Sequence, residues 1–166
     1  SVFFMKIVSV LENQKFEKRI AITPEIAKKY SSLGFDVYLS KNYGAHLGIT
    51  DDEYKKIGVQ FSDDEKEIIN LADIVVQLRL LSEENSSFLK HDQTLIGILN
   101  PYDNKQKLEK LSQKKINLFS LELLPRITRA QSMDILSSQA NLAGYKAVIE
   151  SFANFEKAIP MMMTAA

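Results

Sequence analysis

The feature that most constrains the fold of this chain is a regular alternation of short strand-like runs with helical patterns. Six runs rich in branched and aromatic apolar residues are separated by stretches that carry helix-start signals. Such alternation is typical of a parallel sheet whose connections are helices packed against it. We therefore predict an α/β fold.

The expected strands cover residues 6–11, 36–39, 59–61, 74–78, 94–99 and 116–121. The expected helices cover residues 24–33, 63–70 and 101–113, with shorter helical pieces that begin near Thr50 and Ser82. Thr23 followed by Pro24 is a typical pair of N-cap and first helical residue. The order of these elements predicts a Rossmann-like or flavodoxin-like parallel sheet flanked by helices.

A long last helix is expected from Ser132 to about Ala158, ended by Pro160, because proline interrupts helical hydrogen bonding. It carries two apolar stripes, namely Met133, Leu136, Ala140, Ala143 and Ala147 on one face and Tyr145, Val148, Phe152 and Phe155 on another. A helix that is apolar on two sides packs on two sides, so we expect one face to meet a missing domain or a second chain. The expected division is an N-terminal α/β subdomain at 1–131, a long interdomain helix at 132–160 and the start of a linker at 161–166.

Composition excludes several classes of function. Lysine and arginine number 21 and balance 21 aspartates and glutamates, so no strong field favours nucleic acid or an anionic membrane. The absence of cysteine excludes disulfides, thiolate nucleophiles and cysteine metal sites. No apolar run approaches the roughly 20 residues that span a bilayer. We expect a soluble protein that contacts neither nucleic acid nor the membrane interior directly.

The histidines and glycines offer no recognisable site. His46 and His91 are far apart in sequence and lack partners at ligand spacing, so neither is expected to bind metal or to act as an acid or base. Gly44 and Gly48 do not form a phosphate-binding motif and are expected to turn a loop. We predict no metal site.

The densest polar stretch connects the last strand to the long helix. Its polar side chains include Arg126, Arg129, Gln131, Asp134 and Ser137. Polar groups this dense between apolar elements are costly to bury without a ligand or partner. An ordinary helix start, with Ser132 as N-cap and Asp134 in the first turn, would explain only two of the polar groups. The stretch therefore predicts a ligand site at a strand-to-helix junction.

The residue types in this stretch favour an anionic ligand that also carries an amide. Two arginines suit a carboxylate or pyrophosphate, and a glutamine amide can donate to and accept from a carboxamide. The stretch has neither a nucleophile–base pair nor a metal cluster. It therefore suits a reaction in which a cofactor supplies the chemistry and the protein orients it.

Three segments carry a resemblance to a known family. Residues 125–134 and 137–145, the ending 159–166, and the opening 6–8, 17–25 and 33–37 resemble the NAD(H)-binding component of proton-translocating NAD(P) transhydrogenase, the N-terminal part of its alpha subunit. The opening is also shared with the related alanine dehydrogenases. The resemblance implies that a dinucleotide-binding Rossmann subdomain follows the long helix.

This resemblance implies an enzyme that transfers hydride between NADH and NADP⁺, coupled to proton translocation. NAD(H) would bind here, and NADP(H) would bind on a partner component. Carried over by motif, the catalytic residues are Arg126, Gln131 and Asp134, and the cofactor-binding residues are Arg126, Arg129, Gln131, Asp134 and Ser137. Gln131 would hold the ring amide, while Arg126 near Asp134 would orient the nicotinamide.

The resemblance also implies assembly and location. A homodimer would associate with an NADP(H)-binding component and a transmembrane proton-channel component, on the cytoplasmic or matrix side of the inner membrane and peripheral to it. The fragment alone is expected to be inactive, because the subdomain that grips most of the cofactor is missing.

Two alternatives remain open. An alanine dehydrogenase would need a carboxylate anchor and proton-transfer groups. Arg19 matches the substrate-binding arginine of those enzymes, but Gln77 stands at their lysine position and Asn100 falls near their histidine position. The second alternative is a non-catalytic module that dimerises through the long helix.

Overall fold

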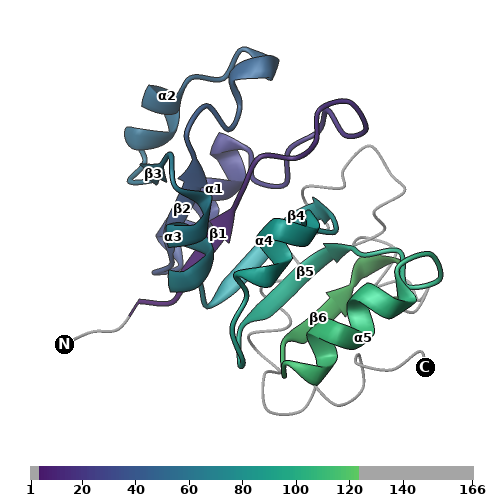
Figure 1. The fold of residues 1–166 in the computed structure, drawn as a ribbon. Helices are drawn as coiled ribbons and strands as arrows, with labels where there is room; N and C mark the ends of the chain where they lie inside the picture. The colour runs from purple at the N-terminus through teal and green to yellow at the C-terminus, as the bar shows by residue number, and fades with distance from the viewer. Residues whose placement is uncertain (1–3, 124–166) are drawn as a thin grey trace, which may run out of the picture.

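A six-stranded, fully parallel sheet forms the centre of the molecule (Figure 1). The computed structural model describes residues 4–123. The strand order is β3-β2-β1-β4-β5-β6, and the strands are β1 (Lys6–Ser9), β2 (Asp36–Ser40), β3 (Gln60–Ser62), β4 (Ile74–Arg79), β5 (Thr94–Ile98) and β6 (Asn117–Ser120). The predicted parallel α/β fold is confirmed.

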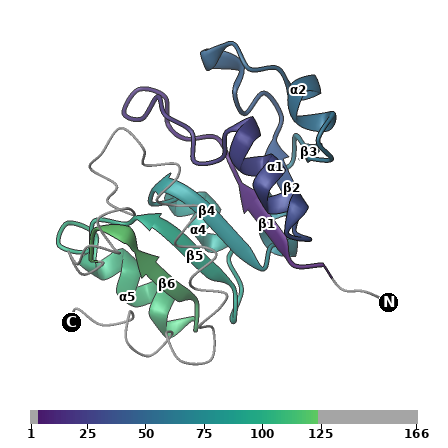
Figure 2. The same cartoon turned by 180° about the vertical axis from the view of Figure 1, so that it is seen from behind.

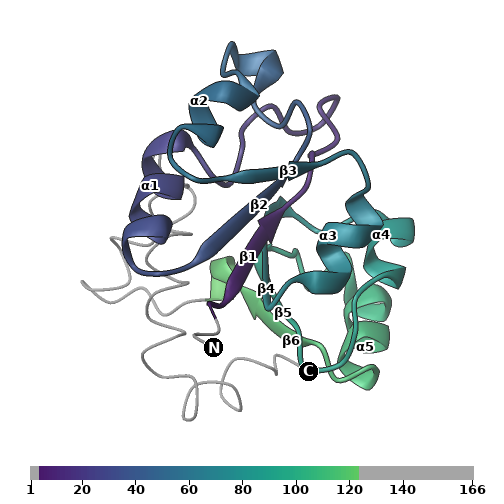
Figure 3. The same ribbon diagram turned by 90° about the vertical axis from the view of Figure 1, so that its left-hand side faces the viewer.

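Helices cover both faces of this sheet. They are α1 (Pro24–Ser32), α2 (Asp51–Lys55), α3 (Glu65–Leu71), α4 (Glu83–Ser87) and α5 (Lys105–Gln113), with short 3-10 helices at Ala45–Leu47 and Leu121–Leu123. Seen along the sheet, α1 lies on one face, and α3, α4 and α5 lie on the other (Figure 3). The view from behind brings α1 in front of β1 and β2 (Figure 2). No helix within residues 4–123 is long and apolar enough to cross a membrane.

Each face has its own apolar core. Ile26 and Tyr30 of α1 join Tyr54 of α2 in the cluster on one face. Ile69 of α3 and Leu111 of α5 belong to the cluster on the other. Strands buried on both faces read as nearly continuous apolar runs rather than as alternating ones, which explains why 74–78 and 94–99 were recognisable as strands.

Local capping starts the first two helices where the sequence predicts. The Thr23 hydroxyl accepts from the Ile26 amide at 3.3 Å, with Pro24 as the first helical residue. At α2 the Thr50 side chain accepts from the Glu53 amide, while the Glu53 carboxylate accepts from the Thr50 amide at 2.6 Å. This capping box satisfies amides that the helix itself leaves without partners.

Among the predicted boundaries that differ from the structure, two differ for identifiable reasons. The first strand ends at Ser9, two residues early, because the amides of Val10 and Leu11 donate to side chains instead of a neighbouring strand. The helix predicted from residue 101 begins at Lys105, because Asn100 has a φ of 49° and the chain turns there. Asn104 holds that turn by donating to the Leu99 carbonyl at 2.8 Å.

The predicted long helix at 132–160, its two apolar stripes and the boundaries at 131 and 161 lie outside the described residues, so this domain division stays a prediction.

Candidate functional site

The strand order creates a switch point between β1 and β4. From β1 the chain moves outward through β2 to β3, and from β4 it moves outward through β5 to β6, so β1 and β4 are neighbours whose following connections diverge (Figure 1). In open parallel sheets, ligands bind at the carboxyl ends of the strands at such a point. The polar side chains gathered there form the candidate site, which we call the switch-point cluster: Ser9, Glu12, Glu17, Arg19, Tyr43, Gln77 and Arg79.

Gln77 lies at the centre of the switch-point cluster, and its amide is fully hydrogen-bonded. The side chain is only 2% exposed. Its Oε1 accepts from the Val10 amide at 2.8 Å and from the Ser9 hydroxyl at 3.1 Å. Its Nε2 donates to the Val10 carbonyl at 3.2 Å and to Glu12 at 3.3 Å. Gln77 thereby fastens the end of β1 to β4 and keeps no hydrogen-bonding capacity for proton transfer.

Tyr43 extends this buried network across the chain. Its hydroxyl lies 2.8 Å from the Ser9 Oγ and accepts from the amides of Ala21 and Ile22 at 3.1 and 3.2 Å. Because Ser9 donates its proton to Gln77, the Tyr43 hydroxyl is the donor in the remaining bond. Burial raises the pKa of Tyr43, although these bonds oppose the effect. Tyr43 therefore remains a neutral structural donor.

The Glu12 side chain accepts hydrogen bonds from the backbone at the carboxyl end of β4. Its Oε1 accepts from the Leu78 amide at 2.6 Å and from the Arg79 amide at 3.4 Å. Burial raises the pKa of Glu12 to about 7, because desolvation outweighs the two backbone hydrogen bonds and the Arg79 charge. Glu12 is thus a carboxyl group that exchanges its proton near neutral pH.

Glu17 holds two arginines at the same edge. Its carboxylate is bidentate to Arg19, with Nε 2.8 Å from one oxygen and Nη2 2.9 Å from the other. Arg79 Nε lies 3.2 Å from the second oxygen. The hydrogen bonds from Arg19 lower the pKa of Glu17. Both guanidinium side chains are about half exposed, at 50% and 56%, so each retains donors that face solvent.

A bulge in β4 shapes this part of the sheet. Between the pairs Val76–Ile96 and Arg79–Ile98, β4 advances three residues while β5 advances two. The extra residue turns the end of β4 at Gln77. Gly97 makes this possible, because a Cβ there would lie 2.5 Å from the Gln77 carbonyl oxygen.

The residues predicted as catalytic or cofactor-binding, Arg126, Arg129, Gln131, Asp134 and Ser137, lie outside the described residues. Of the positions compared with alanine dehydrogenases, the structure brings Arg19 and Gln77 together in the switch-point cluster. Asn100 lies at the end of β5, where its side chain donates to Asp103 and its amide to Glu122.

The glycine and histidine predictions can be compared with the structure. Gly44 and Gly48 flank the 3-10 helix, and Gly48 ends it with a φ of 75°, so the predicted turn role is confirmed. The exposed His46 bonds to the Lys18 carbonyl at 2.8 Å and to Gln14 at 3.2 Å. Within residues 4–123 there is no group of three or more histidines, aspartates or glutamates placed to hold a metal ion.

Sequence reasoning missed Ser9, Glu12, Glu17, Tyr43 and Arg79 as members of this cluster. A partial signal for two of them was present, because Ser9 and Arg79, the last residues of β1 and β4, lie close to the strand ends at 11 and 78 that the sequence predicts. Nothing in the sequence marks Tyr43, which reaches the cluster from the loop after β2.

The comparisons with known proteins agree with this architecture. The family described as "Alanine dehydrogenase/PNT, N-terminal domain" matches residues 9–143. The first of the polypeptides that make up the NAD(P) transhydrogenase subunit alpha of Rickettsia prowazekii is 42% identical over 98% of this chain and 43% of its own length. Alanine dehydrogenase 1 of Staphylococcus aureus is 27% identical over 87% of the chain and 38% of its own length.

A crystal structure of a transhydrogenase from Sinorhizobium meliloti aligns with a TM-score of 0.74 and 41% identity, over 96% of this chain and 48% of that one. The chain spans less than half the length of these relatives. The family match covers most of the chain, and the transhydrogenase relatives are more similar than the alanine dehydrogenases. The chain therefore belongs to the alanine dehydrogenase/PNT N-terminal domain family, as the N-terminal part of a transhydrogenase alpha subunit.

Proposed function

We propose that this chain is the N-terminal part of a protein that binds NAD(H) and transfers hydride between NADH and NADP⁺, with NADP(H) held by a partner component. The observation that carries the proposal is its 42% identity, over 98% of the chain, to a transhydrogenase alpha subunit. The nicotinamide, when bound, supplies the hydride. The protein's task is then to orient the ring and to exclude water.

The site residues that we propose for this task follow the last described strand. Arg126, Gln131 and Asp134 orient the nicotinamide, and Arg129 and Ser137 contact the cofactor. The switch-point cluster fits a role beside them, because Arg19 and Arg79 present half-exposed guanidinium donors at the carboxyl edge of the sheet. Those donors suit a carboxamide or an anionic group.

The wider assembly is also a proposal. The chain is expected to work within a homodimer, beside an NADP(H)-binding component and a transmembrane component through which protons cross. Its place is the cytoplasmic or matrix side of the membrane, held there by its partners. Alone it is expected to be inactive, because a Rossmann subdomain beyond this chain would supply most of the grip on NAD(H).

Amino-acid oxidation of the alanine dehydrogenase kind is the competing function. It needs groups that move protons to and from an imine and water. In this structure the Gln77 amide is committed to Ser9, Val10 and Glu12. Glu12 titrates near neutral pH but accepts from the backbone of β4. Because the Gln77 amide is fully hydrogen-bonded, the lysine position of alanine dehydrogenases supplies no proton-transfer group here, which argues against amino-acid oxidation.

The test uses the complete polypeptide mixed with an NADP(H)-binding partner component. NADH oxidation is followed with an NADP⁺ analogue as acceptor and, separately, with pyruvate plus ammonium. Turnover with the nucleotide alone is expected. Turnover with pyruvate plus ammonium would reject the proposal and show that Gln77 does not prevent amino-acid chemistry.

A further inference from the structure

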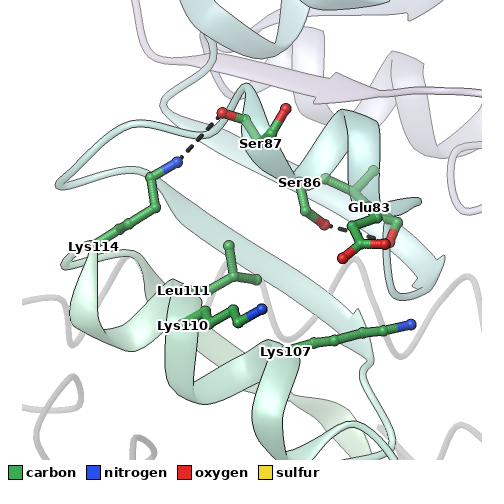
Figure 4. A pocket seen from close by; sticks show the side chains of 8 residues that line it. Glu83, Ser86, Ser87, Lys107, Lys110, Leu111 and Lys114 are labelled. Atoms are coloured by element: carbon green, nitrogen blue, oxygen red, sulfur yellow. Dashed lines mark hydrogen bonds between the residues drawn. The ribbon is translucent and has the colours of Figure 1, made fainter.

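A small pocket lies between α4 and α5, on the face of the sheet opposite α1 (Figure 4). Its volume is about 230 Å³, which is below the several hundred Å³ of typical small-molecule sites and suits one large side chain. None of its lining residues belongs to the switch-point cluster. The pocket therefore needs an explanation of its own.

The floor of the pocket is apolar. Leu81 and Leu111 line it and are 6% and 5% exposed. Both belong to the apolar cluster that α3 and α5 form on this face. An apolar side chain seated here would extend an existing, well-packed core rather than cover a loose surface patch.

One wall of the pocket is a row of three cations. Lys107 and Lys110 lie on α5 and Lys114 is its C-cap residue, and their spacing of three and four residues places them on one side of the helix. Lys114 Nζ donates to the Ser87 carbonyl at 3.3 Å across the pocket. Within residues 4–123, neither Lys107 nor Lys110 forms an ion pair, whereas Lys105 on the same helix lies 4.0 Å from Glu109.

The opposite wall of the pocket carries a carboxylate and a hydroxyl group. Glu83 and Ser86 of α4 face the lysine row across the pocket (Figure 4). The two walls therefore differ in charge, and an extended ligand would be held in one orientation, with acidic groups along α5 and its apolar group on the floor.

We propose that the α4–α5 pocket binds an acidic peptide segment of a partner protein through one apolar anchor side chain. The lysine row pairs with acidic residues of that segment, and the floor receives a leucine or phenylalanine. An anionic membrane fits less well, because Glu83 repels it and the chain carries no net positive charge. A symmetric contact with a second copy would oppose two lysine rows.

The experiment titrates the 166-residue chain with a fluorescein-labelled heptapeptide of six acidic residues around a central phenylalanine. Amide NMR shifts locate the binding. Saturable binding is expected, with the largest shifts at Ser86, Ser87 and Leu111. A peptide with serine in the central position is expected to bind at least tenfold more weakly, because it lacks the anchor.

Two variants test the two halves of the pocket. The triple variant K107E/K110E/K114E is expected to weaken binding at least tenfold, and the matched control K28E/K41E/K56E, also exposed, is expected to stay within twofold. Ser87→Trp, which fills the pocket and keeps all three lysines, is expected to weaken binding as well. Thermal unfolding of each variant verifies the fold.

Several outcomes would overturn the proposal. Absence of peptide binding, equal binding of the serine peptide, or indifference to both variants would each reject an anchored acidic ligand. Phosphatidylserine vesicles that bind the chain when the peptide does not would assign the surface to a membrane. Self-association that the triple variant abolishes, without peptide binding, would assign it to a second copy.

Discussion

Glu12 makes the stability of this protein depend on pH in an unusual direction. Its folded-state pKa of about 7 lies above the ordinary value of 4.5, so the folded protein binds more protons than the unfolded chain between these pH values. Stability from this group is fully present below about pH 4.5 and is lost as pH rises through 7. The ionised Glu12 carboxylate therefore destabilises the folded protein at alkaline pH.

Glu12→Gln is expected to remove this dependence, since the amide oxygen can still accept from the Leu78 amide. Urea unfolding should show the variant close to the wild type at pH 5 and more stable by about 2 kcal/mol at pH 8. Glu25→Gln, on the exposed side of α1, is the control and should leave the profile unchanged. Parallel profiles for wild type and Glu12→Gln would contradict the assignment.

Glu17 makes the stability of the protein depend on pH in the opposite direction to Glu12. The hydrogen bonds from Arg19 lower the pKa of Glu17 from 4.5, so its stabilisation is present above the ordinary pKa and is lost as pH falls through the folded pKa. Glu17→Gln removes the shared charge between Arg19 and Arg79 and should cost about 1–2 kcal/mol at pH 7.

That cost is measured by denaturant unfolding, and it should shrink as the pH is lowered toward 4. Glu109→Gln, which removes a carboxylate from the surface pair with Lys105, should cost no more than about 0.5 kcal/mol. If the two variants lose the same amount of stability, the double arginine contact contributes nothing beyond an ordinary surface pair.

The sequence predicts the roles of individual residues better than the contacts between residues that are distant in the chain. It indicated Arg19 and Gln77 through resemblance, and it correctly expected Gly48 to turn the chain. It could not indicate that Glu17 would bridge Arg19 and Arg79, because Arg79 is 62 residues away along the chain. Such contacts depend on which strands become neighbours, and local patterns carry no signal for that.

Among the elements, the end of β4 is the most constrained, because the β4 bulge brings the Gln77 carbonyl against Gly97 of β5. Gly97→Ala would place a Cβ 2.5 Å from that carbonyl oxygen, and backbone must move to relieve the contact. We expect a loss of about 2–3 kcal/mol in the free energy of unfolding, measured by denaturant titration.

Gln60→Ala, on the exposed side of the edge strand β3, is the matched control and should change stability by about 0.5 kcal/mol or less. Unchanged stability of Gly97→Ala would mean that the bulge adjusts freely and does not fix the position of Gln77.

The elements themselves were predictable because their signals are local. Thr23 with Pro24, and Thr50 with Glu53, start their helices through contacts within three or four residues. Boundaries were predicted less well where side chains from other elements compete with the backbone. The amide of Val10 donates to Gln77 rather than extending β1, and Gln77 lies in another strand.

For the molecule as a whole, the alternation of strands and helices predicts a parallel sheet, and the observed strand order places the switch point between β1 and β4. We expect NAD(H) binding and hydride transfer to depend on different parts of the protein. The proposed nicotinamide residues follow β6 in sequence, while most of the grip on the cofactor is assigned to a subdomain beyond this chain. Mutations should therefore be able to disturb the orientation of the nicotinamide without greatly changing the affinity for NADH.

Gln131→Asn and Arg126→Ala, each made in the complete polypeptide, are the changes that test this separation. Each should slow hydride transfer to an NADP⁺ analogue about 100-fold, because a small misplacement of the ring removes the reacting geometry. The dissociation constant for NADH, measured by equilibrium titration, should rise only a few-fold. Lys28→Ala on α1, an exposed lysine, controls for the effect of losing a surface charge. Equal losses of rate and affinity would contradict the orienting role, since a residue that contributes only binding weakens ground and transition states alike.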